Sequence, residues 1–399
     1  MAAFELMDKA LAFWENGKYT DPDKALEYLN KAISLDSNYA DAYIVRGGTW
    51  LDKGNYDQAI LDFNKAIELN PEYNAAYLGR GLAWYGKGNY DQGILDFNKA
   101  IELNPEFADA YCYRGITWKN KGNYDQAILD YNKAIKLNPG NATTYNHRGI
   151  AWSDKGNYDQ AILDYNKAIK LNPGNATTYN HRGIAWSDKG NYDQAILDYN
   201  KAIKLNPGNA TTYNHRGIAW SDKGNYDQAI SDYNKAVELN PGYAKAYYYR
   251  GLAWHGKGNY DQAISDYNKA IELNPGYADA YCYRGITWSD KGNYDQAISN
   301  YNQAIKLNPE YNAAYLGRGL AWYGKVNYDK AILDFNKAIE LNPGHANAYI
   351  GRGLAWHDKG NYAQAVSDYN NYLRINGNKD GIANQVRQKI RNLGYNPKY

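Results

Sequence analysis

One 34-residue segment occurs twice in succession without a single change, from Ala142 to Asn209. It reads ATTYNHRGIAWSDKGNYDQAILDYNKAIKLNPGN, and related copies follow the same period through most of the chain. A short fixed period is typical of architectures in which each unit packs mainly against its neighbours. The 399 residues are therefore expected to form one elongated array instead of two or three globular domains.

The pattern inside each copy predicts a pair of helices. Positions are counted from the first residue of a copy, so that position 4 is Tyr145 in the copy that begins at Ala142. Positions 4, 7, 8 and 11 share one face of a first helix, and positions 20, 23, 24 and 27 share one face of a second. The run Lys155-Gly156-Asn157 ends the first helix, and Asn172-Pro173 ends the second.

A 34-residue helix-turn-helix with aromatic residues at 4, 11 and 24, Gly at 8, Ala at 20 and 27 and Pro at 32 resembles the tetratricopeptide repeat. The resemblance implies an all-α fold, a right-handed α-α superhelical solenoid of about eleven helix-turn-helix repeats. The first repeat fits if Thr20-Asp21-Pro22 is an insertion in its turn. The expected repeat array, residues 3–379, divides into 3–39, 40–73, 74–107, 108–141, 142–175, 176–209, 210–243, 244–277, 278–311, 312–345 and 346–379.

Residues 380–399 are expected to form a C-terminal capping helix and tail. Ile382, Val386, Ile390 and Leu393 lie on one helical stripe, while the charged residues between them face away. An apolar side toward the array and a charged side toward water are what a terminal cap requires.

Two columns of constant residues have structural interpretations. Ten copies carry Trp at position 11, which we expect to be the main hydrophobic spine and not a stacking platform for bases or sugars. The same ten copies carry Arg at position 7, and a buried cation needs a partner. Asp at position 23 is the candidate partner, for example Asp164 for Arg148, which predicts a ladder of Arg-Asp pairs; a row of arginines that binds anions is the alternative.

Two irregular copies, with Val326 in place of the turn glycine and Gly93 in place of a packed alanine, are expected to be local soft spots.

Function is expected on the opposite face of the first helix. Resemblance to the tetratricopeptide repeat implies that positions 2, 5, 6, 9, 12 and 13 line a concave groove that binds partner segments. A variable, solvated surface without a ligand is the alternative interpretation. The candidate ligand-binding residues are Asn146, His147, Ser153, Asp154, Asn180, His181, Ser187, Asp188, Asn214, His215, Ser221, Asp222, Tyr248 and Tyr249.

Other chemistries find little support in the sequence. The formal charge of +2 produces no long-range field, so neither nucleic acid nor a membrane is an expected partner. Residues 81–88 resemble a phosphate-binding loop, but they lack the final Ser or Thr and fall within a helix. Successive histidines at position 6 lie about one helix layer apart, too far to share a zinc ion. No catalytic residue, metal site or cofactor is predicted, and an enzyme is not expected.

These observations favour a non-catalytic scaffold that binds a protein or peptide in its groove. Chaperone-binding tetratricopeptide proteins hold a terminal carboxylate with a set of lysines and asparagines, of which only Lys245 at position 2 is found at the corresponding positions, so binding of that kind is not expected. Two alternatives remain: near-identical units could self-associate into oligomers or fibres, or the chain could be a designed, consensus-like array. A cytoplasmic location is expected, because neither a signal peptide nor a transmembrane segment is seen.

Overall fold

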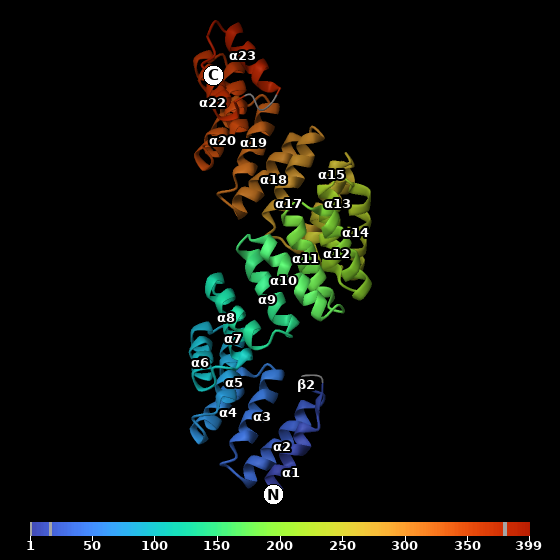
Figure 1. Ribbon diagram of the computed structural model, residues 1–399. Helices are drawn as coiled ribbons and strands as arrows, with labels where there is room; N and C mark the ends of the chain where they lie inside the picture. Colours follow the sequence, from blue (N-terminus) through green and yellow to red (C-terminus); the bar gives the residue numbers. More distant parts are fainter. Residues whose placement is uncertain (1, 16–17, 378–380) are drawn as a thin grey trace. The chain divides into compact units, whose positions relative to one another are not determined.

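The computed structural model describes residues 2–15, 18–377 and 381–399. The chain divides into two compact units, residues 1–206 and 207–399. Both are stacks of antiparallel helix pairs (Figure 1), and eleven such pairs follow one another along the sequence. The all-α solenoid expected from the sequence is therefore confirmed.

The first unit contains twelve helices and one short strand pair among its described residues. Their bounds are α1 (Ala2–Leu11), β1 (Trp14–Glu15), β2 (Lys18–Tyr19), α2 (Pro22–Leu35), α3 (Ala40–Asp52), α4 (Tyr56–Leu69), α5 (Asn74–Gly86), α6 (Tyr90–Leu103), α7 (Ala108–Asn120), α8 (Tyr124–Leu137), α9 (Ala142–Asp154), α10 (Tyr158–Leu171), α11 (Ala176–Asp188) and α12 (Tyr192–Leu205). The antiparallel pair β1 and β2 places Trp14 opposite Tyr19, so the first repeat has a longer turn than the others.

The second unit consists of helices only in the part of it that the structure describes. Its helices are α13 (Ala210–Asp222), α14 (Tyr226–Leu239), α15 (Ala244–Gly256), α16 (Tyr260–Leu273), α17 (Ala278–Asp290), α18 (Tyr294–Leu307), α19 (Asn312–Gly324), α20 (Tyr328–Leu341), α21 (Ala346–Asp358), α22 (Tyr362–Asn376) and α23 (Ile382–Asn392). Odd-numbered helices from α13 to α21 are the first helices of repeats, and even-numbered helices are the second.

Local signals explain where the helices begin and end. The side chain of Asn157 accepts a hydrogen bond from the backbone N–H of Gln160 and caps the N-terminus of α10. Just before it, Gly156 has φ 77°, the left-handed conformation that ends α9. Asn141 caps α9 itself by accepting from the backbone N–H of Thr143 at 3.0 Å. The same turn chemistry recurs in most repeats and sets the hairpin geometry.

The aromatic residues at position 24 form the fully buried column, and the tryptophans at position 11 do not. Tyr165, for example, is 2% exposed, and its ring lies so close to Gly149 that a Cβ there would come within 2.6 Å. The tryptophans at position 11 are half-buried and pack at the edges of these clusters. The expectation that tryptophan forms the main spine was therefore wrong. Small residues at positions 3 and 10, such as Thr144 and Ala151, are also buried, although their role was not recognised in the sequence.

The expected ladder of Arg-Asp pairs is confirmed. Arg148 Nε and Nη2 donate to Asp164 Oδ2 and Oδ1 at 2.7 and 2.6 Å, a bidentate geometry. Its remaining nitrogen, Nη1, donates to Oδ1 of Asn132 in the preceding repeat at 2.5 Å. The guanidinium also lies over the ring of Tyr145, 5.6 Å from its centroid. One arginine thus joins the two helices of its own repeat and the second helix of the repeat before it.

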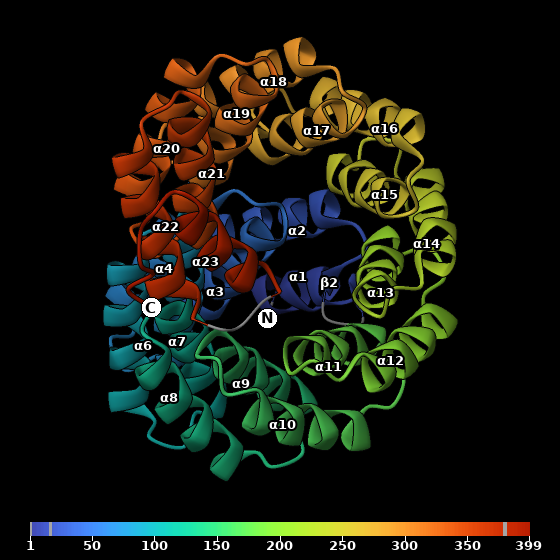
Figure 2. The same cartoon turned by 90° about the horizontal axis from the view of Figure 1, so that it is seen from above.

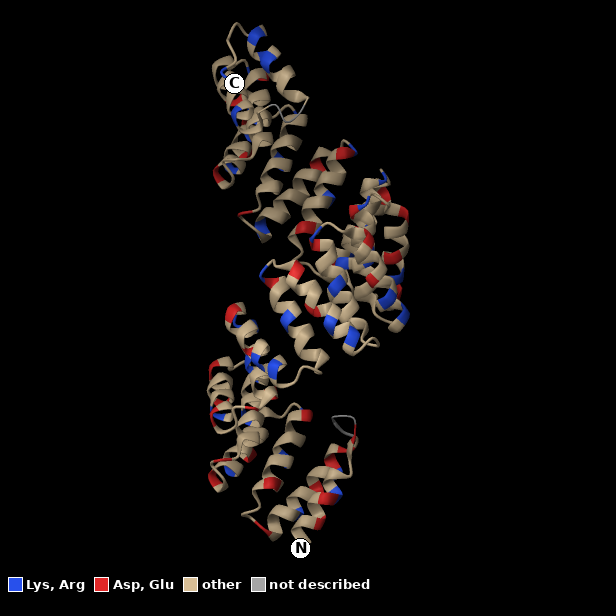
Figure 3. Cartoon of the chain, in the orientation of Figure 1, with Lys and Arg blue, Asp and Glu red and all other residues tan. Residues whose placement is uncertain are grey.

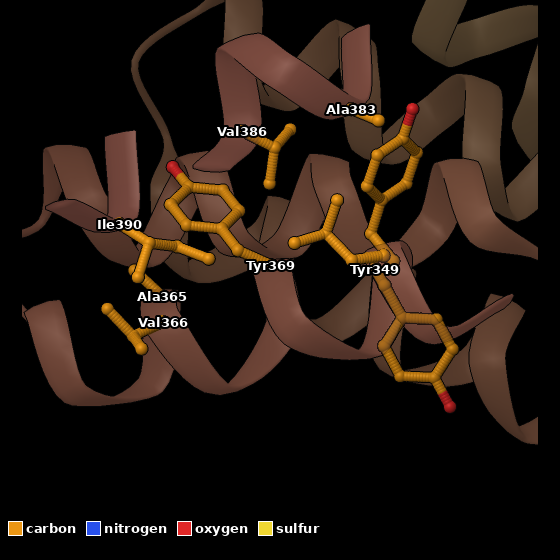
Figure 4. Close-up of a cluster of buried hydrophobic side chains, with 9 residues drawn as sticks. Tyr349, Ala365, Val366, Tyr369, Ala383, Val386 and Ile390 are labelled. Atoms are coloured by element: carbon orange, nitrogen blue, oxygen red, sulfur yellow. The ribbon is translucent and has the colours of Figure 1, made fainter. Parts of the chain in front are cut away.

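The last helix packs on the second unit as a cap would (Figure 4). Ala383, Val386 and Ile390 of α23 are buried against Tyr369 and its neighbours on α22. Ile382 instead remains 47% exposed at the start of the helix. The apolar stripe expected in this segment therefore contacts the array through its central residues.

The strained turn at Val326 gives a first prediction. Val326 has φ 61° and is the only non-glycine residue with positive φ among those described. A β-branched side chain disfavours this conformation, so Val326→Gly should raise the free energy of unfolding by about 1 kcal/mol. The midpoint of urea unfolding measures the change. Gly292→Val, at the same position with φ 77°, is the matched control and should lower stability; equal midpoints for all three proteins would contradict the prediction.

The irregular rung of the ladder gives a second prediction. Arg284 Nε donates to the amide oxygen of Asn300 at 2.6 Å where other repeats have a carboxylate, and burial lowers the pKa of Arg284. Asn300→Asp should therefore stabilise the fold at pH 7 by about 1 to 2 kcal/mol, because it supplies the missing counter-charge. Thermal unfolding measures the gain. The inverse change, Asp266→Asn at an intact rung, should destabilise, and a lower melting temperature for Asn300→Asp would disprove the interpretation.

Candidate functional site

The first helices line the inner side of each stack. In the first unit α5 contacts α7, α7 contacts α9, and α9 contacts α11 directly. The view in Figure 2 shows α9 and α11 inside and α10 and α12 outside, and in the second unit α13 and α15 inside and α14 and α16 outside. We call the residues at positions 2, 5, 6, 9, 12 and 13 of these first helices the inner face. All the candidate ligand-binding residues belong to it.

In the first unit, neighbouring inner-face residues contact one another. Nδ1 of His181 donates to Oδ1 of Asn146 at 3.1 Å, so position 6 of one repeat is joined to position 5 of the repeat before it. His147 lies on the ring of Tyr131, with centroids 6.2 Å apart, and His181 lies likewise near Tyr165 at 6.0 Å. The histidines therefore cover the buried rings of the preceding repeats. Ser153 and Ser187 are half-buried, while Asp154 and Asp188 are exposed.

His147 and His181 both favour the neutral form. Burial and, secondarily, the nearby charge of Lys119 lower the pKa of His147 to about 4, and the same causes lower the pKa of His181. Neutral imidazole rings can accept as well as donate hydrogen bonds, whereas imidazolium can only donate. At neutral pH the inner face of α9 and α11 thus presents neutral amides, hydroxyls and imidazoles, bordered by the exposed carboxylates of Asp154 and Asp188 and by the charge of Lys119 on α7.

In the second unit α13 keeps the histidine at position 6, His215, whereas α15 has Tyr249 there. The ring of Tyr249 stacks on Tyr233 with centroids 6.3 Å apart. Asn214 is only 2% exposed, and its Oδ1 has no hydrogen-bond partner among the described residues. Tyr248 is 8% exposed and contacts four other tyrosines, so its ring is part of the core. Ser221 lies 3.5 Å from the hydroxyl of Tyr233, His215 is half-buried and Asp222 is exposed.

A pocket of about 220 Å³ lies on the inner face between α17 and α19. Gly317, at position 6, has no side chain to fill this space. A Cβ at this residue would lie only 2.5 Å from the ring of Tyr301, so a larger residue would collide with it. Its lining is mainly apolar, with one carboxylate and two residues that carry hydroxyls: Ile286, Ser289, Asp290, Tyr301, Ala313, Leu316, Gly317 and Leu320. The sequence indicates that leucines enrich this part of the face, but not that a cavity lies there. Glycine at position 6 does not by itself signal the pocket, because Gly79 and Gly351 occupy the same position of other repeats.

The described residues contain no group of His, Cys, Asp and Glu placed to hold a metal ion. Within the same residues, no helix has the length and apolar character needed to cross a membrane. The inner faces offer hydrogen-bonding groups, side-chain-sized pockets and a few carboxylates. Such groups can bind a ligand through hydrogen bonds and apolar contacts.

The fold and these faces define a class, the helical-hairpin repeat proteins. The chain belongs to the tetratricopeptide repeat family, whose members generally mediate protein interactions. Models of this repeat, one of which spans more than half of the chain, match residues 7–74, 51–106, 216–278, 289–346 and 327–380, then 108–141, 142–175 and 176–209, and also 266–299.

Solved structures agree at the level of the fold. The APC/C hetero-tetramer Cut9-Hcn1 matches with a TM-score of 0.52 and 15% identity, over 92% of this chain and 93% of that chain. A tetratricopeptide repeat protein from Parabacteroides merdae ATCC 43184 matches with a TM-score of 0.51 and 23% identity, over 61% of this chain and 96% of that chain. A search of curated proteins finds no match.

The low histidine pKa values predict a loss of stability in acid. Between pH 6.5 and about 4 the unfolded chain binds a proton at His147 that the folded chain does not, so stability falls as the pH falls through this window; the lowered pKa of His181 acts in the same direction. The double variant His147→Tyr/His181→Tyr, with the residue found at Tyr113 and Tyr249, should remove about 2 kcal/mol of this loss. Urea unfolding at pH 7 and pH 4.5 measures it. An identical pH dependence in both proteins would contradict the assignment.

Proposed function

We propose that the chain is a non-catalytic scaffold that binds a peptide or protein segment along the inner faces of its first helices. Membership of a family of interaction proteins supports this proposal. The observation that carries it is the pocket between α17 and α19, whose volume of about 220 Å³ suits one aliphatic or aromatic side chain. Asp290 and Ser289 at the pocket can accept hydrogen bonds from the backbone of a partner.

Polar groups elsewhere on the inner faces fit an extended partner. In the second unit, the half-buried Ser221 and the exposed Asp222 can accept hydrogen bonds from the backbone of a bound segment. In the first unit, Asn146 and His181 present a hydrogen-bonded pair whose remaining donors and acceptors can serve the same purpose.

A substitution at the pocket tests the proposal. Leu320 is 46% exposed and lines the pocket, so Leu320→Asp should place a charge in it without unfolding the chain. Partners captured from a lysate of the source cells by the wild-type chain should be reduced by about 10-fold or more. Quantitative mass spectrometry of pull-downs measures this ratio.

The matched control is Leu252→Asp, at the same position of the repeat beginning at Ala244, where Tyr249 occupies position 6 in place of glycine. This variant should retain the partners that Leu320→Asp loses. A triple variant, Asn146→Ala with Asn180→Ala and Asn214→Ala, tests the polar part of the inner faces in the same way. Identical partner lists for wild type, Leu320→Asp and the triple variant would reject the inner faces as the binding site.

A further inference from the structure

The outer side of the first unit exposes a column of leucines that its fold does not use. Position 22 of five successive second helices is leucine, and each of these side chains is 58% exposed: Leu61, Leu95, Leu129, Leu163 and Leu197. In the second unit the corresponding residues of α14, α16 and α18 are Ser231, Ser265 and Ser299, and the leucine at this position of α20, Leu333, stands apart from any row. A regular row of exposed leucines on one unit is an apolar surface of the kind found at interaction sites.

Lysines accompany the leucines on three of these helices. Lys133 and Lys136 follow Leu129 on α8 at positions 26 and 29, and α10 and α12 repeat this arrangement with Lys167, Lys170, Lys201 and Lys204. Positions 22, 26 and 29 are spaced i, i+4, i+7, so they lie on one stripe of each helix. We call the nine residues Leu129, Lys133, Lys136, Leu163, Lys167, Lys170, Leu197, Lys201 and Lys204 the leucine-lysine ridge.

The ridge carries positive charge that the fold leaves uncompensated. On α4 and α6 the lysine at position 26 pairs with a glutamate at position 29, as Lys65 does with Glu68 at 2.7 Å. On α8, α10 and α12 position 29 is itself a lysine, and across the described residues none of the six ridge lysines forms an ion pair. Lys and Arg are blue and Asp and Glu red in Figure 3.

The other regular cations of these repeats are already paired. Arginines at position 7 are held by aspartates at position 23, and lysines at position 14 pair with aspartates at position 18 of the preceding repeat, as Lys155 does with Asp125. The ridge lysines at position 26 lie 5.8 to 6.0 Å from the centroids of the tyrosines at position 4, which holds their stems against the helix surface. The lysines at position 29 are exposed. Net positive charge is therefore concentrated beside the leucines.

We propose that the leucine-lysine ridge docks a second partner, an acidic polypeptide segment with aliphatic side chains. Carboxylates would pair with the six lysines, and aliphatic groups would cover the three leucines. The ridge is on the outer side of the first unit, formed by second helices, so it is separate from the inner faces to which the first partner is assigned. With both sites, one chain could hold two proteins at once.

The composition of the ridge favours a protein partner over the two other anionic partners. Single-stranded nucleic acid is bound by stacking on aromatic rings, and the nine ridge residues include neither an aromatic residue nor an arginine. A helix that lies in a membrane surface buries a continuous apolar face, whereas each second helix adds only one leucine to the ridge.

The ridge can be tested by substituting its residues with those that other repeats of the same chain carry at the same positions. Leu129→Ser/Leu163→Ser/Leu197→Ser and Lys136→Glu/Lys170→Glu/Lys204→Glu introduce the residues that α14 and α16 carry at the same positions, within helices that fold. The probe is a fluorescent synthetic helix with leucine at every third or fourth position and glutamate elsewhere, and the readout is fluorescence anisotropy with the full chain. Each triple variant should weaken binding by about 10-fold or more, and added salt should weaken the binding of wild type.

A transplant gives the converse test. Adding Ser231→Leu, Glu238→Lys, Ser265→Leu and Glu272→Lys to a chain that carries both triple changes should restore part of the binding on α14 and α16, where the lysines at position 26 are already present. Circular dichroism should show unchanged helix content in all variants. Leu320→Asp should leave binding of the probe unchanged, so failure of this proposal and failure of the inner-face proposal can be told apart.

Three results would overturn the proposal. The first is equal binding of the probe to wild type and to both triple variants. The second is equal affinity of wild type for the probe and for a peptide with serine in place of leucine, because the leucines would then have no role. The third is tighter, ridge-dependent binding to single-stranded DNA or to phosphatidylserine vesicles than to the probe.

Discussion

Each repeat depends on burying one aromatic ring that its own two helices cannot enclose. Phe63 on α4 lies against Gly47 of its own repeat and against Gly79 of the next, where a Cβ would come within 2.9 and 2.4 Å of the ring. The ring is therefore held between two successive first helices. A single hairpin would leave one side of it in water, so stability comes from stacking neighbours.

The arginine at position 7 adds a polar link to this apolar contact. Since its guanidinium binds an aspartate in the same repeat and an asparagine in the preceding one, it fixes how adjacent repeats are oriented. A half-buried arginine without partners would be costly, so the link favours one register over others. Together the ring and the arginine occupy the facing surfaces of neighbouring helices. The residues of the inner face and of the outer side of the stack are left free to vary.

The repeats differ from one another mainly at these variable positions. At position 6 of the first helix, histidine, tyrosine and glycine give three different inner surfaces over the same buried ring: a polar pair at His181, an aromatic cover at Tyr249 and an open pocket at Gly317. At positions 22 and 29 of the second helix, leucine with lysine gives way to serine with glutamate. These few positions therefore give the inner face and the outer side different side-chain chemistry.

Periodicity alone determined the helix pairs, their ends, the number of repeats and the Arg-Asp pairing, because each follows from local spacing repeated at a constant interval. It did not determine which aromatic column is fully buried, since tryptophan and tyrosine both lie on apolar stripes and only the stacking of three helices around one ring excludes water from it. The pocket at Gly317 and the unpaired oxygen of Asn214 likewise arise from contacts between neighbouring repeats. A helical wheel describes one helix at a time, whereas burial in a stack is a property of the neighbours, and only the tertiary structure decided it.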